Sequence, residues 1–143
     1  MSYAALQDMV DRFGETELVQ LSDRSMTATT IDETVVAAKL ADAAAEIDGY
    51  LGQRFTLPLA SVPPVLKRIA TDLARYHLYD DRATEQVTKR YDDAIAFLKG
   101  VAKGDLSIGV DEGGEEPAQA IGAPVFVEGE SVFARDKIRD FIG

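Results

Sequence analysis

The spacing of apolar residues predicts a long helix in the first half of the chain. From Glu33 to about Gln53, large apolar residues recur every three or four positions, which is typical of a helix with one buried face. These residues are Val36, Leu40, Ala43, Ile47, Tyr50 and Leu51. Such a helix would be roughly 30 Å long. The order Thr30-Ile31-Asp32-Glu33 fits a capping box, so we expect Thr30 to cap the helix.

The opposite face of this helix carries only small residues, namely Ala38, Ala41, Ala45 and Gly49. A glycine inside a helix lowers helix stability by about 1 kcal/mol relative to alanine, so the presence of Gly49 needs an explanation. Another helix or a neighbouring copy approaching closely along this face is one explanation. The other is that alanine is simply a good helix former on a solvated face. We take these four positions as candidate protein-interface residues.

The remaining pattern indicates a mainly α protein. Apolar periodicity and helix-end residues predict further helical segments over residues 4–13, 15–21, 64–79 and 85–103. Ser2 and Thr84 are expected N-caps, Pro64 suits a first helical turn, and Gly14 and Gly104 suit helix ends. We therefore expect residues 1–108 to form a small antiparallel-type helical bundle around the long central helix.

The C-terminal quarter differs in composition from the bundle. Residues 109–121 are acidic and glycine-rich without periodicity, which is typical of a linker. Residues 122–143 favour a short β-hairpin followed by a terminal helix over residues 135–142. Because this tail is apolar but too small for its own core, we expect it to dock on the body or on a partner. Phe126 and Phe133 are added to the candidate interface residues.

Charge and composition narrow the classes of partner. The net charge is −10, from 25 acidic and 15 basic residues. This argues against specific nucleic-acid binding, which needs clustered Lys and Arg, and leaves room for a basic protein partner. No apolar run approaches the roughly 20 residues of a membrane span, and the N-terminus lacks signal-peptide features. We expect synthesis in a cytoplasm and no membrane partner.

Residue chemistry offers little for catalysis. The chain has no cysteine, which excludes thiolate metal sites and cysteine nucleophiles. The single histidine, His77, lies on the apolar side of its predicted helix and is interpreted as a satisfied core residue. Arg68, Asp72 and Arg75 are expected to form an ion-pair ladder on the surface, and Glu85 to pair with Lys89. No nucleophile, base and orienting group can be assembled, so we expect no enzyme, no cofactor and no metal.

Several short stretches, in order, carry a resemblance to a known family. They are Tyr3-Ala4 with Leu6; Arg12-Phe13-Gly14; Glu17-Leu18-Val19-Gln20-Leu21-Ser22-Asp23; Ala44-Ala45-Glu46-Ile47-Asp48-Gly49-Tyr50-Leu51; Arg54-Phe55 with Leu57-Pro58-Leu59; Val62-Pro63-Pro64; Ala74-Arg75-Tyr76-His77-Leu78-Tyr79; and Phe133-Ala134-Arg135-Asp136. Their order and spacing resemble a family of Mu-like phage and prophage proteins.

That family is similar to the head–tail connector, or adaptor, proteins of tailed phages. The resemblance implies a structural protein of the virion neck that forms a ring, expected to be dodecameric, between the portal protein and a tail or neck protein. It supplies no catalytic residues. The alternative is a cytoplasmic acidic helical adaptor or regulator that binds a basic protein. Both readings require that the helices pack against protein neighbours.

Overall fold

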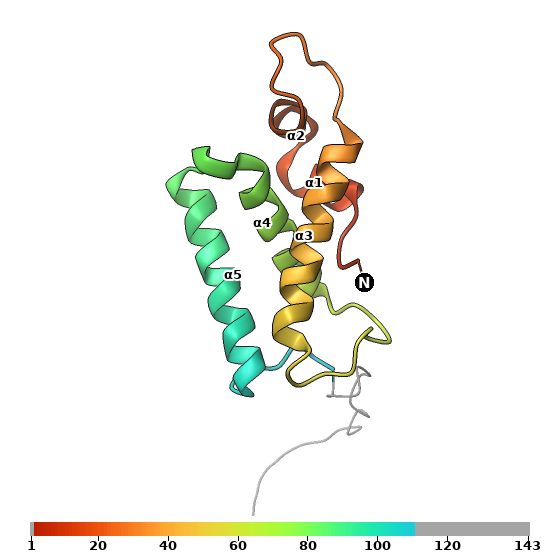
Figure 1. Cartoon of the computed structure of the whole chain (residues 1–143), viewed down its shortest axis with the longest axis vertical. Coiled ribbons are helices and arrows are strands. Elements are labelled where there is room, and N and C mark those ends of the chain that lie inside the picture. Colours follow the sequence, from red (N-terminus) through yellow and green to blue (C-terminus); the bar gives the residue numbers. More distant parts are fainter. Residues whose placement is uncertain (1, 111–143) are drawn as a thin grey trace, which may run out of the picture.

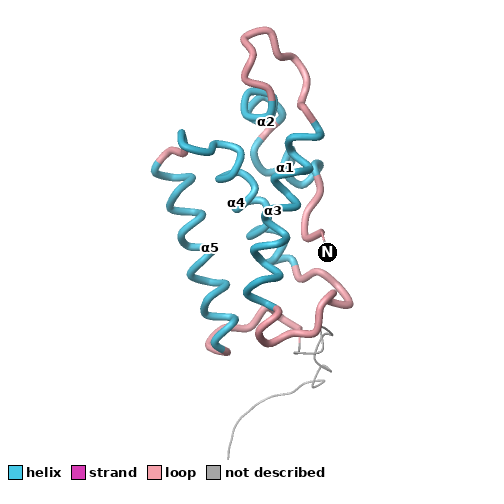
Figure 2. Tube along the Cα trace, in the orientation of Figure 1, coloured by secondary structure: helices cyan, strands magenta, loops and turns pink. Residues whose placement is uncertain are grey.

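The computed structural model describes residues 2–110 of the 143-residue chain. Within this range lie five α-helices and one 3-10 turn (Figure 1). They are α1 (Leu6–Phe13), α2 (Glu15–Ser22), α3 (Glu33–Leu51), α4 (Pro64–Tyr79), the 3-10 turn η1 (Asp80–Arg82) and α5 (Glu85–Lys103). Loops join them, and residues 2–110 contain no strand (Figure 2).

The three long helices form an antiparallel bundle. Following the sequence colours in Figure 1, α3 and α5 run in one direction and α4 runs back between them. Helix α4 packs against both α3 and α5. The two short helices α1 and α2 contact α3 and α4, and α2 is seen end-on at the end of the bundle where α3 begins.

Helix α3 begins at an aspartate cap, which corrects the prediction that Thr30 caps it. The Asp32 carboxylate accepts hydrogen bonds from the amides of Thr34 and Val35, at 3.1 and 3.3 Å. Aspartate is as good an N-cap as threonine, and here it lies directly before the first helical residue. The helix ends at Leu51, two residues before the predicted end.

The other helix ends follow local sequence signals, with one exception. Pro64 opens α4, Thr84 caps α5 by accepting from the Val87 amide at 3.2 Å, and Gly104 ends α5 in the left-handed conformation. The exception is α1, where the expected cap Ser2 lies too far upstream. The Asp8 carboxylate instead accepts from the Ala5 amide at 2.8 Å, so the helix begins at Leu6.

The core fills the space between α3, α4 and α5 and continues under α1 and α2. Met9 and Leu18 are fully buried, so the short helices belong to the same core as the bundle. The predicted apolar face of α3 is confirmed: Val36, Ala43, Ile47 and Leu51 are buried, and Leu40 and Tyr50 pack against the core.

The segment that follows α5 also enters this core through Ile108 and Val110. The mainly helical fold predicted from the sequence is confirmed for residues 2–110. The predicted hairpin and terminal helix of residues 122–143 lie outside the described residues.

Candidate interaction surface

The small-residue face of α3 points away from the bundle core. Ala38, Ala41, Ala45 and Gly49 are all exposed. A Cβ atom added to Gly49 would have no neighbour within 4 Å, so no contact within the described chain requires glycine there. The structure therefore places these four candidates together on one open helix face. The other two candidates, Phe126 and Phe133, lie outside the described residues.

This α3 face is unusual beside the outward face of α5. Between Val35 and Leu51, the exposed residues of α3 are five small ones and one charged one, namely Ala37, Ala38, Ala41, Asp42, Ala45 and Gly49. The exposed residues of α5 are mostly charged or polar, namely Glu85, Gln86, Lys89, Asp92, Asp93, Ala96, Lys99 and Lys103. Solvated helix faces normally resemble that of α5. The exposed face of α3 therefore carries far fewer charges than that of α5.

An apolar groove runs along one side of this face, with a volume of about 630 Å³. Its floor is built from α3 residues Ala37, Leu40, Ala41, Ala44 and Ala45. Its wall is the N-terminal segment, through Ser2, Ala4, Ala5 and Leu6. Of the predicted interface residues, the groove brings together Ala41 and Ala45. Ala38 and Gly49 lie on the same helix but do not line it.

The N-terminal segment holds its place because Tyr3 anchors it. The Tyr3 side chain is 3% exposed, and its hydroxyl donates to the Asp48 carboxylate at 2.5 Å. Burial, followed by the hydrogen bond and the charge of Asp48, raises the pKa of Tyr3 above its ordinary value. The groove wall is therefore fixed to α3 by a bond between residues 45 positions apart. Sequence reasoning missed this role, and the one signal was an aromatic residue just before the first helix.

His77 belongs to a polar cluster that joins three helices. Its Nε2 contacts the Glu46 carboxylate of α3, which also accepts a hydrogen bond from the Tyr91 hydroxyl of α5 at 3.1 Å. The Tyr91 ring stacks on Tyr76, with centroids 3.9 Å apart. Burial, and then the nearby Glu46 charge, raise the pKa of Tyr91 to about 12. His77 has a polar partner, as interpreted, but it is half-buried and lies at the edge of the core, so the expectation of a core residue is wrong.

The expected ladder of Arg68, Asp72 and Arg75 is only partly correct. Asp72 is 3% exposed, and its nearest cation is Arg12 of α1, at 2.8 Å, with Arg68 at 3.7 Å. Folding buries Asp72 because α1 packs over this part of α4.

Arg75 forms a two-pronged contact with Glu17 of α2, at 2.7 and 3.1 Å. Burial lowers the pKa of Arg75, but Glu17 and Tyr79 outweigh that effect and raise it. Arg12, bound to Asp72, holds α1 on the bundle, and Arg75, bound to Glu17, holds α2 there. On α5, Lys89 reaches Asp93 at 3.0 Å, where we had expected Glu85 as its partner.

Residues 2–110 contain no group of three or more His, Asp or Glu side chains arranged to hold a metal ion. Nor does any helix among them have the length and apolarity to cross a membrane.

Comparison with known proteins defines the class to which the chain belongs. Residues 3–127 match the family described as Bacteriophage Mu, Gp36, so the chain is a member of this family of phage proteins. The matched span contains every described helix and all the groove-lining residues except Ser2. The resemblance to Mu-like phage and prophage proteins inferred from the sequence is thereby confirmed.

Two relatives illustrate how close the membership is. The chain is 38% identical over 140 residues to the Mu-like prophage FluMu protein gp36 of Haemophilus influenzae, which covers 98% of each chain. It is 39% identical over 111 residues to gene product J of Escherichia phage Mu, which covers 78% of this chain and 79% of that protein.

Proposed function

We propose that this protein is a structural subunit of the phage neck that forms a ring between the portal protein and a tail or neck protein. In this role it contacts identical neighbours within the ring, expected to number twelve in all, and turns over no substrate. Its membership of the Mu gp36 family, together with the resemblance of that family to head–tail connectors, supports the proposal. The observation that carries it is the uncovered small-residue face of α3.

A ring subunit needs such a face for a physical reason. A closed ring is built from heterologous contacts, in which one surface of a subunit meets a different surface of its neighbour. Packed helix axes usually lie 8–10 Å apart, depending on the side chains at the contact. A neighbouring helix could approach much of α3 at the shorter of these distances, because the side chains at the contact would be small, namely Ala38, Ala41, Ala45 and Gly49. The charged outward face of α5 offers no comparable approach.

Electron microscopy of the purified protein mixed with its phage portal tests the proposal. We expect an additional ring on the portal with the same rotational symmetry. The alternative function, an acidic adaptor or regulator that binds a basic protein, predicts a portal that is unchanged. If the portal particles carried no added ring even when this protein was in large excess over the portal, the connector role would be contradicted.

A matched pair of variants tests the part assigned to α3. Ala45→Glu places a charge on the small-residue face, whereas Ala96→Glu places the same side chain at an exposed position of α5. Both isolated proteins should keep near wild-type stability, because exposed substitutions usually change it by less than about 0.5 kcal/mol. We expect ring formation on the portal to be lost for Ala45→Glu alone. Equal ring formation by both variants would show that this face does not contact a neighbour.

A further inference from the structure

The groove between the N-terminal segment and α3 has the dimensions of a binding site for a short helix. Its first and last lining residues on α3 are Glu33 and Asp48, which are about 22 Å apart at the helical rise per residue. Between them the floor is apolar, formed by residues such as Ala37, Leu40 and Ala44. An amphipathic helix commonly binds by laying its apolar side in such a groove.

The same chain contains a segment with the matching pattern. Ala134, Ile138, Phe141 and Ile142 follow the spacing i, i+4, i+7 and i+8, which puts them on one side of a helix. The nine residues 134–142 would form a helix about 14 Å long, which is shorter than the groove. This segment therefore supplies three large apolar side chains to a groove floor made mainly of alanine.

Charge favours the same pairing. The charged residues that line the groove are Glu33 and Asp48, both acidic. In a chain with a net charge of −10, residues 133–143 hold three basic side chains against two acidic ones, namely Arg135, Lys137 and Arg139 against Asp136 and Asp140. The attraction between exposed charges is weak and screened by salt, so it orients the segment while apolar burial supplies most of the binding.

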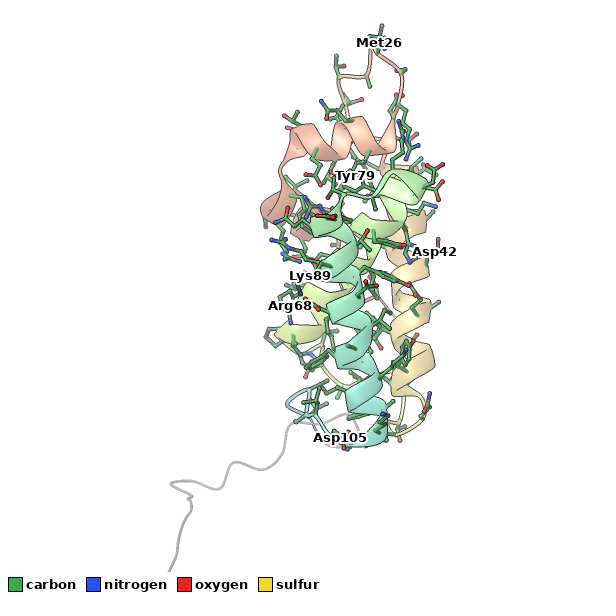
Figure 3. The ribbon with its side chains drawn as sticks, turned by 90° about the vertical axis from the view of Figure 1, so that its left-hand side faces the viewer. Met26, Asp42, Arg68, Tyr79, Lys89 and Asp105 are labelled. Carbon is green, nitrogen blue, oxygen red and sulfur yellow. The ribbon has the colours of Figure 1, made fainter. Side chains whose placement is uncertain are left out.

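The chain is long enough to reach the groove. The described part ends at Val110. The segment that follows α5 lies at the end of the bundle where α3 and α5 end (Figures 1 and 3). A chain of 23 residues, the length of residues 111–133, can span at most about 76 Å. That limit is well above the length of α3, so every point of the groove lies within reach.

From these observations we propose that residues 134–142 bind in the α3 groove of their own chain. A segment that belongs to the same chain as its groove acts at an effective concentration near the millimolar range, which favours the same chain over a neighbour in dilute solution. Because the groove contains Ala41 and Ala45, the bound segment covers part of the small-residue face. If the proposed neck function holds, on which this consequence rests, the segment keeps the free protein monomeric and leaves the groove when a neighbour takes its place.

Cross-linking tests the proposal directly, because the chain has no cysteine of its own. One full-length variant combines Ala37→Cys in the groove with Lys137→Cys in the segment. The control combines Lys99→Cys, exposed on α5, with the same Lys137→Cys. With a short bismaleimide, we expect the groove pair to cross-link within single chains about tenfold faster than the control pair, at a rate independent of protein concentration.

Two outcomes of this experiment would overturn the proposal. Equal rates for the two pairs would mean that the segment has no preference for the groove. Cross-links found only between two chains, at a rate that rises with concentration, would mean that the groove binds the segment of a second copy.

A second pair of variants tests the groove itself. Adding Ala41→Glu to the groove pair should lower its cross-linking rate to that of the control pair, whereas Ala38→Glu, on the same helix outside the groove, should leave it unchanged. Equal effects of the two glutamates would overturn the proposal. The cross-linking experiments contain no portal, so a negative result would not contradict the proposed neck function. Likewise, the absence of a ring on the portal would not contradict a positive cross-linking result.

Discussion

Gly49 allows the small-residue face of α3 to be tested through the stability of the free protein. Gly49 lies inside α3 in ordinary helical geometry, and an added Cβ would enter open space. Replacing it with alanine removes the backbone entropy penalty of glycine without creating a clash. The free protein should therefore become more stable. Glycine at this position lowers the stability of the free protein, and no contact in the described fold requires it.

The size of the gain follows from the position of Gly49 in its helix. A mid-helix Gly→Ala change is worth about 1 kcal/mol. Because Gly49 lies two residues before the end of α3 at Leu51, where helices fray, we expect about 0.5–1 kcal/mol. For a protein of this size, that corresponds to a rise in Tm of about 2–4 °C.

Thermal and urea unfolding followed by circular dichroism would measure the change. Gly104→Ala is the matched control, because Gly104 ends α5 at a φ of 92°, where an L side chain is strained. It should lower the free energy of unfolding by about 1 kcal/mol. If Gly49→Ala failed to stabilise the protein while Gly104→Ala behaved as expected, the structure of this helix face in solution would differ from the one described. A stabilised Gly49→Ala variant that forms rings less well would show that glycine serves the contact with a neighbour.

Two further predictions concern the polar contacts that sequence reasoning did not anticipate. Asp72→Asn should lower the free energy of unfolding measured in urea by about 2 kcal/mol, because it removes a charge-assisted contact from a buried group; this figure is already reduced for the partial exposure of Arg12. Asp93→Asn, at the exposed pair with Lys89, should change the free energy of unfolding by less than about 0.5 kcal/mol. Equal losses for the two variants would contradict the burial of Asp72. Tyr91 has a pKa raised from 10.0 to about 12, so the folded state holds this proton more tightly than the unfolded state. Its contribution to stability is therefore fully present below pH 10 and is lost as the pH rises towards 12. Tyr91→Phe should flatten that decline in unfolding experiments, and an unchanged decline would assign it to another group.

Much of the secondary structure could be predicted because its signals are local. Proline at a first helical turn, threonine before a helix and glycine after one act on neighbouring amides and carbonyls. The bounds of α4 and α5 were therefore predicted from Pro64, Thr84 and Gly104. The first helical residue of α3 was predicted correctly as Glu33, but its N-cap was placed two residues early, at Thr30 in place of Asp32. The choice of cap depends on how the preceding loop enters the helix.

The candidate surface was only partly predictable. The four small residues of α3 share a face by helical period alone, and the structure adds that this face is open. The groove depends on Tyr3 reaching Asp48, and sequence spacing does not show that the N-terminal segment lies along α3. Asp72 was expected on the surface for the same reason, since the packing of α1 decides its burial.

The sequence by itself determined which segments are helical, which side of each helix is apolar, and that the chain resembles proteins of Mu-like phages. Each of these rests on residues within a few turns of one another, or on the order of motifs along the chain. The tertiary structure alone decided which polar groups are buried, that Glu46 joins three helices, and that a groove borders the small-residue face. Those features depend on contacts between residues 31 to 60 positions apart, and only packing the helices together creates them.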